Sequence, residues 1–216
     1  MIRIIGEQNS ILNKFISEIR DVNIQNDRLR FRRNLERIGE IFAYEISKEL
    51  EYENKDVKTP LGTSNMNIMK DNIVLATVLR AGLPLHQGLL NYYDKAQNAF
   101  VGSFRKYHKD NSFEIKSGYI STPDIENKFL IISDPMLASG SSLVLAYKDL
   151  TANGEPKHTH IVTIIAAKEG VEYMQKNLPK EKFTIWIGAL DNELTAKSYI
   201  VPGLGDAGDL AYGEKI

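Results

Sequence analysis

Apolar side chains recur at helical spacing in the first fifty residues of the chain. In residues 10–21, "SILNKFISEIRD", the apolar positions fall on one face of a helix. Residues 26–51 repeat the pattern, and Asn26 or Asp27 stands where an N-cap is expected. The pattern therefore predicts two amphipathic helices at the start of the chain.

Beyond residue 70 the pattern changes to short runs of β-branched and aromatic side chains of strand length. The predicted strands are residues 72–78, 99–104, 128–134, 160–166 and 183–188. Helical patterns separate several of them, notably at residues 141–153 and 169–178. Strands that alternate with helices and are apolar throughout indicate an α/β fold, with a mostly parallel central sheet buried between flanking helices.

Residues 105–127 interrupt this alternation. The stretch, "RKYHKDNSFEIKSGYISTPDIEN", is polar and has no clear period. We expect it to form a long arm, folded as a hairpin, between two strands of the core.

Length and composition narrow the class of protein. A chain of 216 residues with 43% hydrophobic residues is expected to form a single domain over residues 1–216. The 27 basic and 28 acidic residues balance, so nucleic acid is an unlikely main partner. Cysteine is absent, which excludes disulfides and thiolate chemistry. The start of the chain lacks a signal-peptide pattern and no run of apolar residues is long enough for a membrane span, so we expect a cytoplasmic protein.

The candidate functional residues lie in loops that follow the predicted strands, because ligands of parallel sheets bind beyond the carboxyl ends of the strands. The first loop is "DPMLASGSS", residues 134–142, which leads from a strand into a helix. Backbone amides at a helix start, with Gly140 allowing close approach, suit a phosphate group. A helix cap is the equally favoured alternative, and the loop is not a P-loop because no Gly-Lys-Ser/Thr follows.

The second loop is "VLRAGLPLHQG", residues 78–88, where Arg80 closes an apolar strand. A guanidinium at this edge can bind phosphate through two parallel hydrogen bonds. A structural salt bridge is the alternative.

The third stretch is "YIVPGLGDAGDLAYG", residues 199–213, with four glycines and one proline among its fifteen residues. This composition predicts a loop rather than a helix or strand. A long glycine loop is either functional or disordered, and the apolar residues at its start favour an ordered, functional loop.

Together the three stretches resemble the uracil phosphoribosyltransferase family, whose members have the type I phosphoribosyltransferase fold. The resemblance rests on "DPMLASGSS", "LRAG" and "YIVPGLGDAGD", and it extends to "RFRRNLERIGEIFAYEISKEL" and the "TPLG" that follows at 59–62. The last of the three motifs distinguishes the uracil branch from other type I members. The implied fold carries a hood built from the N- and C-terminal segments.

The resemblance implies a role for each matching residue. Asp134, Arg80 and Arg105 would be catalytic, and phosphoribosyl pyrophosphate (PRPP) and uracil would be the substrates. The residues implied to bind PRPP are Arg80, Arg105, Asp134, Pro135, Met136, Leu137, Ala138, Ser139, Gly140, Ser141, Ser142 and Asp206. Those implied to read uracil are Ile200, Gly205, Asp206 and Ala207. A non-proline cis peptide bond is expected between Arg80 and Ala81.

The implied reaction gives UMP and pyrophosphate, a step of pyrimidine salvage. Mg²⁺ would arrive with PRPP, because this ion keeps its waters and binds through substrate oxygens, so no protein metal site is expected. His158 and His160 are expected in a surface turn rather than in a metal site. The alternatives are a regulator of pyrimidine genes on the same fold, with "RLRFRR" as its RNA patch, and a transferase for another base.

Two features depart from the family pattern. Ser141 replaces a glycine, which requires either a negative φ at that position or tolerance of a strained positive φ. The sequence after Arg105 also differs, so the arm over the pyrophosphate is expected to be altered. The resemblance further implies a homo-oligomer, dimer or higher, with the N-terminal helices as candidate interface, and small-molecule substrates without a membrane partner.

Overall fold

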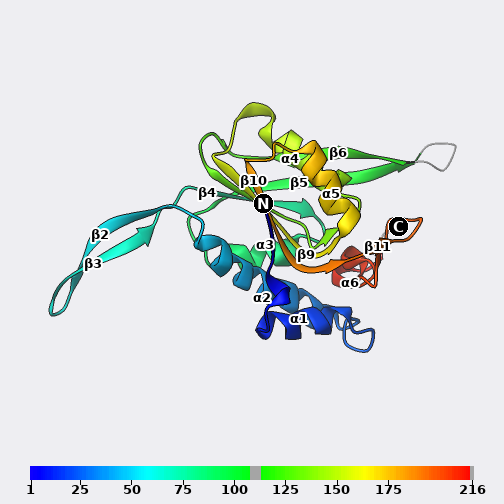
Figure 1. Cartoon of the computed structure of the whole chain (residues 1–216), viewed down its shortest axis with the longest axis horizontal. Helices are drawn as coiled ribbons and strands as arrows, with labels where there is room; N and C mark the ends of the chain where they lie inside the picture. The colour runs from blue at the N-terminus through cyan, green and yellow to red at the C-terminus, as the bar shows by residue number, and fades with distance from the viewer. Residues whose placement is uncertain (108–112, 215–216) are drawn as a thin grey trace.

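A mostly parallel sheet separates two layers of helices (Figure 1). The computed structural model describes residues 1–107 and 113–214, with only the backbone described at 103–107 and 113–117. In spatial order the strands are β1 (Ile2–Ile4), β10 (Phe183–Asp191), β9 (His158–Ala167), β7 (Phe129–Ser133), β4 (Ile73–Leu79), β5 (Gln97–Tyr107) and β6 (Phe113–Ser121). All neighbours along this path are parallel except β5 and β6. The short β8 (Met136–Leu137) pairs with β9.

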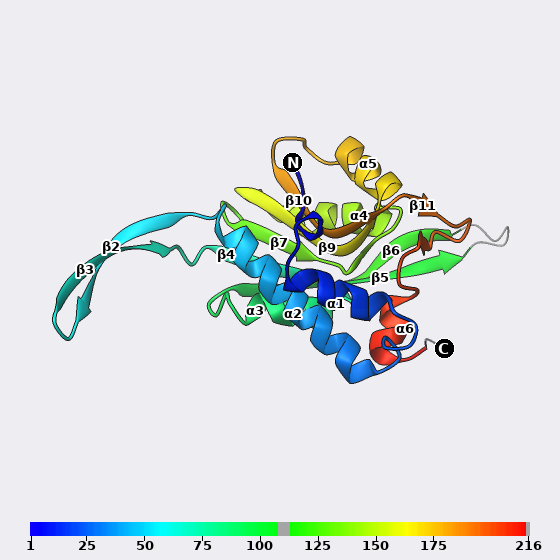
Figure 2. The ribbon, with the colours of Figure 1, turned by 60° about the horizontal axis from the view of Figure 1, so that its bottom comes forward.

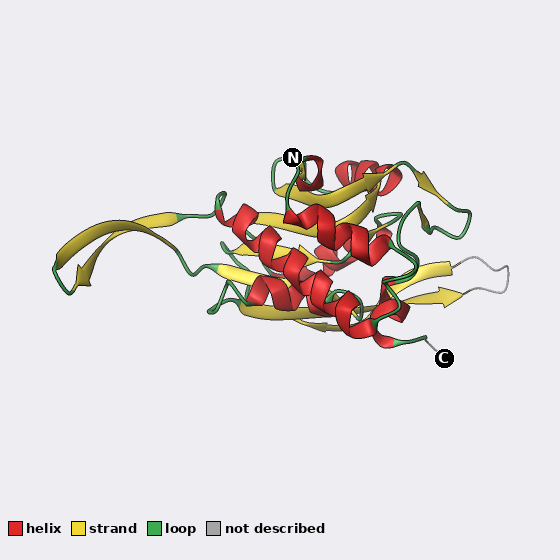
Figure 3. Cartoon of the chain, turned by 90° about the horizontal axis from the view of Figure 1, so that it is seen from below, coloured by secondary structure: helices red, strands yellow, loops and turns green. Residues whose placement is uncertain are grey.

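Helices cover both faces of this sheet. One face carries α1 (Ile11–Arg20), α2 (Arg28–Ser47), α3 (Leu83–Leu90) and α6 (Ala207–Tyr212), and the other carries α4 (Ser141–Leu150) and α5 (Lys168–Asn177) (Figures 1 and 3). Short 3-10 helices, η1 (Ile5–Glu7) and η2 (Thr151–Asn153), follow β1 and α4. Alternate residues of β4 enter opposite cores, Ile73 in one and Val74 in the other. This two-sided burial explains the continuous apolar runs and confirms the predicted α/β fold.

The order of the strands reverses between β4 and β7. From β4 the chain proceeds to β5 on one side, and it later returns to place β7 on the other side of β4. Connections that diverge in this way leave a crevice at the carboxyl ends of the two strands. Arg80 follows β4 and Asp134 follows β7, so the topology brings two predicted site residues to this crevice.

The two N-terminal helices are confirmed, and Asp27 is the N-cap of the second. Its side chain accepts a hydrogen bond of 3.0 Å from the amide of Arg30. Among the described residues, no helix combines the length and the apolar content that crossing a membrane requires.

A hairpin that the sequence pattern did not reveal extends from the body of the molecule. It consists of β2 (Tyr52–Thr59) and β3 (Gly62–Met69), joined at the "TPLG" turn (Figure 2). Nearly all of its side chains are exposed, and Leu61 at the tip is 100% exposed. Because neither face is buried within this chain, no apolar alternation marks the strands.

The predicted arm near 105–127 does contain a hairpin, formed by β5 and β6. Their register shifts between Gly102 and Ser103, which is the position of a bulge or irregularity. The tip of this hairpin, residues 108–112, lies outside the described residues.

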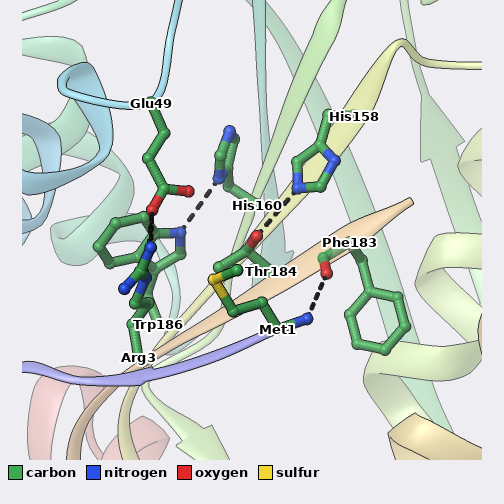
Figure 4. Close-up of polar contacts among 8 residues, drawn as sticks. All are labelled: Met1, Arg3, Glu49, His158, His160, Phe183, Thr184 and Trp186. Carbon is green, nitrogen blue, oxygen red and sulfur yellow. Dashed lines mark hydrogen bonds and ion pairs between the residues drawn. The ribbon is translucent and has the colours of Figure 1, made fainter. Parts of the chain in front are cut away.

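The prediction of a surface turn at His158 and His160 is wrong, because both residues belong to β9 (Figure 4). His160 is 1% exposed, and its Nδ1 accepts a hydrogen bond of 3.1 Å from the indole of Trp186. Burial lowers the pKa of His160 to about 3, so the ring stays neutral in the core. Figure 4 also shows His158 paired with Thr184, so both rings have structural partners.

The prediction of a loop at residues 199–213 is wrong in part. β12 (Ile200–Val201) pairs with β11 (Glu193–Leu194), and residues 207–212 form α6. Asp206 caps this helix, and Ala207 and Ala211 pack into the core that α2 shares. Tertiary packing against α2 therefore stabilises a helix that glycine-rich composition disfavours.

Candidate active site

A cavity of about 220 Å³ opens at the carboxyl ends of β4 and β7. Three segments far apart in sequence line it: the end of β4, the loop from β7 to α4, and the C-terminal loop before α6. The lining residues are Val78, Leu79, Arg80, Ala81, Asp134, Met136, Leu137, Ala138, Ser139, Gly140, Ser142, Leu143, Ser198, Tyr199, Ile200, Gly205, Asp206, Ala207 and Gly208. The structure thus brings together most of the predicted site residues.

The loop before α4 leaves the first backbone amides of this helix without a side-chain cap among the described residues. Gly140, the N-cap, has a left-handed backbone with φ of 81°, and no side chain of the described residues caps the helix. The hydroxyls of Ser139 and Ser141 lie 2.8 Å apart. Amides and hydroxyls at a helix start form a ready site for an anion.

Ser141 is compatible with this loop. It is the first residue of α4, and the described non-glycine residues with positive φ are Asn127 and Ser198. The requirement of a negative φ at the replaced glycine is therefore met.

Close backbone contact with α5 fixes the loop in place. A Cβ on Gly140 would lie 2.8 Å from the carbonyl oxygen of Gly170, and a Cβ on Gly170 would lie 2.1 Å from that of Ala138. The two glycines therefore allow the loop to rest directly on α5.

Pro135 and Ser141 do not line the cavity, although both were predicted to bind PRPP. The carbonyl of Pro135 accepts the amides of Ile164 and Ile165 of β9, at 3.1 and 3.0 Å. Pro135 thus holds the loop on the sheet.

Asp134 is half-buried at the wall of the cavity. Its Oδ1 accepts a hydrogen bond of 3.2 Å from the amide of Met136, so it does not cap the amides of α4. Burial raises the pKa of Asp134 to about 7, and the Met136 amide opposes this rise only in part. Hydroxyl donors or a nearby positive charge would stabilise the ionised form of a carboxylate so placed.

Arg80 also lines the cavity, directly after β4. The non-proline cis bond lies between Leu79 and Arg80, one bond earlier than predicted. The Arg80 Nη2 donates to the carbonyl of Gly213 at 3.1 Å and lies 3.7 Å from Oδ1 of Asp209. The predicted second arginine, Arg105, has its backbone in β5, and its side chain lies outside the described residues.

The C-terminal loop supplies the third wall. Gly205 has φ of 94° and open space where a Cβ would stand, as expected of a residue that faces a ligand. Asp206 accepts the amides of Gly208 and Asp209 at 2.8 and 3.0 Å. Among the described residues, the Ala207 amide therefore remains as a donor for a ligand.

A buried ion pair that sequence reasoning missed anchors this loop. Arg20 of α1 binds both carboxylate oxygens of Asp191 at 2.8 Å and also donates to the carbonyl of Gly203 at 2.8 Å. Asp191 in turn accepts the amide of Gly203 at 2.9 Å. The partners stand more than 170 positions apart, so no local pattern could have predicted them.

Arginines of the "RLRFRR" segment at the start of α2 contact partners within the chain, and Arg33 pairs with Glu36 at 2.7 Å. Arg30 pairs with Glu18 at 2.8 Å, and Arg32 donates to the carbonyl of Ala211 at 2.7 Å. These contacts tie the arginines to the chain itself and disfavour the regulator alternative.

The class of protein follows from these features and from comparison with solved structures. A hypoxanthine phosphoribosyltransferase from Staphylococcus aureus superposes with a TM-score of 0.52 at 14% identity, covering 87% of this chain and 84% of that one. The fold is that of the type I phosphoribosyltransferases. A solved protein of Aquifex aeolicus gives a TM-score of 0.88 at 29% identity, with both chains covered completely.

The sequence identifies the branch of that class. The uracil phosphoribosyltransferase of Porphyromonas gingivalis is 57% identical over 212 residues, which cover 98% of each chain. Residues 6–214 match the model of the family described as uracil phosphoribosyltransferase. The chain belongs to the uracil phosphoribosyltransferase family, as the sequence predicted, and the alternative functions are not favoured.

Replacing Asp134 by Asn should change the pH dependence of stability. The pKa of Asp134 in the folded protein lies above its ordinary value. The folded protein therefore binds more protons than the unfolded chain between about pH 4 and pH 7. Stability falls as the pH rises through this window, and above it the ionised Asp134 destabilises the fold. At pH 8 the variant should be more stable by on the order of 1 kcal/mol, or about 2–4 °C in melting temperature, after allowance for water in the cavity.

Melting curves of the ligand-free protein at pH 4, 6 and 8 test this expectation. The difference between variant and parent should vanish near pH 4. Asp71→Asn, at an exposed carboxylate, is the control and should gain no stability at pH 8. A variant that is less stable than the parent at pH 8 would contradict the assignment of a raised pKa.

Proposed function

We propose that the cavity binds PRPP between the start of α4 and Arg80, with uracil against Ile200 and the segment 205–207. The observation that carries this proposal is that three groups line one cavity. They are the backbone amides at the start of α4, the guanidinium of Arg80, and the C-terminal loop, where Gly205 has open space in place of a Cβ. The enzyme transfers the 5-phosphoribosyl group to N1 of uracil and releases UMP and pyrophosphate. It thereby returns free uracil to the nucleotide pool.

The chemical step is a displacement at the anomeric carbon of the ribose. The bond from this carbon to uracil N1 forms, the bond to the pyrophosphate oxygen breaks, and uracil N1 loses its proton. Positive charge develops on the ribose ring as the pyrophosphate departs. Asp134 would bind the ribose hydroxyls and stabilise that charge, while Arg80 and Arg105 would stabilise the leaving group.

Mg²⁺ fits the donors at the cavity. Asp134 and Asp206 both line it, and Mg²⁺ uses one or two carboxylates together with substrate phosphates and waters. Among the described residues, no three His, Cys, Asp or Glu side chains gather into a metal-binding group. The ion would enter with PRPP and supply positive charge to the pyrophosphate, and the two aspartates would contact its waters.

Backbone groups would form the hydrogen bonds that recognise uracil. Its edge presents an acceptor, a donor and an acceptor, which the amides and carbonyls of the C-terminal loop can match. Cytosine reverses part of this order and would leave buried polar groups unpaired, which costs about 1–3 kcal/mol for each group. This penalty would favour uracil over cytosine at an otherwise similar fit.

The substrate also suggests the compartment. PRPP carries several phosphate charges and cannot cross a bilayer unaided. The enzyme must therefore share a compartment with the reaction that makes PRPP, and we propose the cytoplasm.

The β2–β3 hairpin supports a homo-oligomer. Val57, Leu61, Met66 and Ile68 are exposed on it, although a two-stranded hairpin alone is marginally stable in water. The figures show the hairpin extending away from the rest of its own chain (Figures 1 and 2). A second copy of the chain is the occupant that we propose for these side chains.

The first test offers five bases with PRPP and Mg²⁺ and measures pyrophosphate release. Uracil should be the preferred base by a wide margin. Asp134→Asn should reduce the rate with uracil by about 100-fold, the usual scale for losing one preorganised charged group. Equal turnover of cytosine, or full activity of the variant, would contradict the assigned roles.

Gly205→Ala should impair uracil binding. The positive φ disfavours any side chain, and a Cβ would occupy the space that the base requires. We expect a rise in KM for uracil of about tenfold, equivalent to about 1.4 kcal/mol, with a smaller change in KM for PRPP. Gly62→Ala, at an open site on the hairpin, is the matched control and should leave both KM values unchanged.

Light scattering at micromolar concentration should give the mass of a dimer or a larger assembly. Leu61→Lys places a charge at the fully exposed tip of the hairpin and should shift the equilibrium towards monomer. Val22→Lys, at an exposed apolar position outside the hairpin, is the control. A monomeric parent would refute the oligomer, and an unchanged Leu61→Lys variant would refute the role of the hairpin tip.

A further inference from the structure

The position of the Arg80 guanidinium is not fixed by its own loop. The backbone there is held firmly, because a Cβ on Gly82 would lie 2.2 Å from the hydroxyl of Thr77 and 2.6 Å from the carbonyl of Val78. The side chain beyond that backbone is long and 40% exposed. A charged group at the end of such a chain loses much conformational freedom when it binds a ligand, unless a partner already orients it.

That partner is α6. The Arg80 Nη2 donates to the carbonyl of Gly213, the C-cap of this helix, at 3.1 Å. The same nitrogen lies 3.7 Å from Oδ1 of Asp209, within the distance of an ion pair. Gly213 offers a neutral acceptor, and Asp209 adds a charge on the same side of the guanidinium.

Two polar atoms at this contact are buried without a hydrogen-bond partner among the described residues: Nε of Arg80 and Oδ1 of Asp209. Nε and the nitrogen that contacts α6 belong to one guanidinium fork, which can bind two oxygens in parallel. A contact at 3.7 Å therefore orients this edge of the guanidinium towards α6 without saturating it.

We propose that Asp209 is a positioning residue, which holds the Arg80 guanidinium at the wall of the cavity where the pyrophosphate of PRPP binds. This inference rests on the role proposed for Arg80. It also connects the two substrates, because α6 begins at Asp206 and Ala207, in the wall proposed for uracil. One short helix thus contacts the base through its first residues and orients the pyrophosphate arginine through Asp209 and its C-cap.

The experiment measures binding of Mg²⁺–pyrophosphate by calorimetry, together with KM for PRPP and KM for uracil. Asp209→Asn keeps the size of the side chain and removes its charge. Its KM for PRPP and its Kd for pyrophosphate should rise about two- to fivefold, the effect expected from a half-exposed ion pair. KM for uracil should stay within about twofold. Asp209→Glu, which restores the charge, should recover most of the loss.

Arg32→Gln is the matched control for simple anchoring of the helix. Arg32 donates to the carbonyl of Ala211, and its guanidinium carbon lies 5.9 Å from the centre of the Tyr212 ring, so it holds α6 without contacting Arg80. Loosening the helix by this route leaves the charge of Asp209 beside Arg80, so it should raise KM for PRPP less than Asp209→Asn does. If Arg32→Gln reproduces the selective loss for PRPP, Asp209 acts only by anchoring α6 and the proposal is overturned.

A double-mutant cycle asks whether Asp209 acts through Arg80. In an Arg80→Ala background, Asp209→Asn should change pyrophosphate binding by less than about twofold, because the residue that it positions is gone. An equal loss in both backgrounds would overturn the proposal. Tighter pyrophosphate binding by Asp209→Asn would also overturn it, since Asp209 would then compete with the ligand for Arg80.

High salt gives a further readout that a purely structural role would not move. At about 1 M salt the charges are screened over about 3 Å, so the difference between parent and Asp209→Asn should shrink. If the roles proposed for the cavity were wrong, the parent itself would not bind Mg²⁺–pyrophosphate. Parent binding with an unaffected Asp209→Asn variant would refute the inference about Asp209 alone.

Discussion

The ion pair between Arg20 and Asp191 determines whether the molecule has a closed site. Asp191 ends β10, and its carboxylate and the guanidinium of Arg20 together bind both the amide and the carbonyl of Gly203. These bonds hold the C-terminal segment across the strand ends as a third wall. Removing one partner leaves the other charge uncompensated, which costs about 3–5 kcal/mol in a fully buried pair and less in this partly buried one. That segment lines the cavity together with Arg80 and the loop before α4.

Backbone geometry, more than reactive side chains, forms the surface of the site. The left-handed Gly140 starts α4 with open amides, and Gly205 has open space where a Cβ would stand. A reaction without a covalent protein intermediate requires orientation and charge stabilisation, and fixed amides supply both without reorganising. The close approach of Gly140 to the backbone at Gly170 packs the loop before α4 against α5.

The charged side chains that line the cavity include Arg80, Asp134 and Asp206, and each has different contacts. Asp134 has its pKa raised to about 7 by burial, so its ionisation responds to what occupies the cavity. Arg80 donates a hydrogen bond to the C-cap of α6, and the opposite end of this helix lines the cavity in the space proposed for uracil. The two halves of the site therefore share one short helix, which gives a physical route by which the occupation of one half affects the other.

The sequence by itself determined the elements with strong local signals. The apolar runs specified the sheet strands because both faces of the sheet are buried, Asn26 or Asp27 marked the start of α2, and three loop motifs indicated the site. Only the tertiary structure decided the rest. α6 forms because Ala207 and Ala211 pack into the core shared with α2, and His160 is buried because its ring meets Trp186. The partners of Arg20 stand about 170 residues away, and contacts at that separation leave no periodic trace, since periodicity records only which face of a local element is buried.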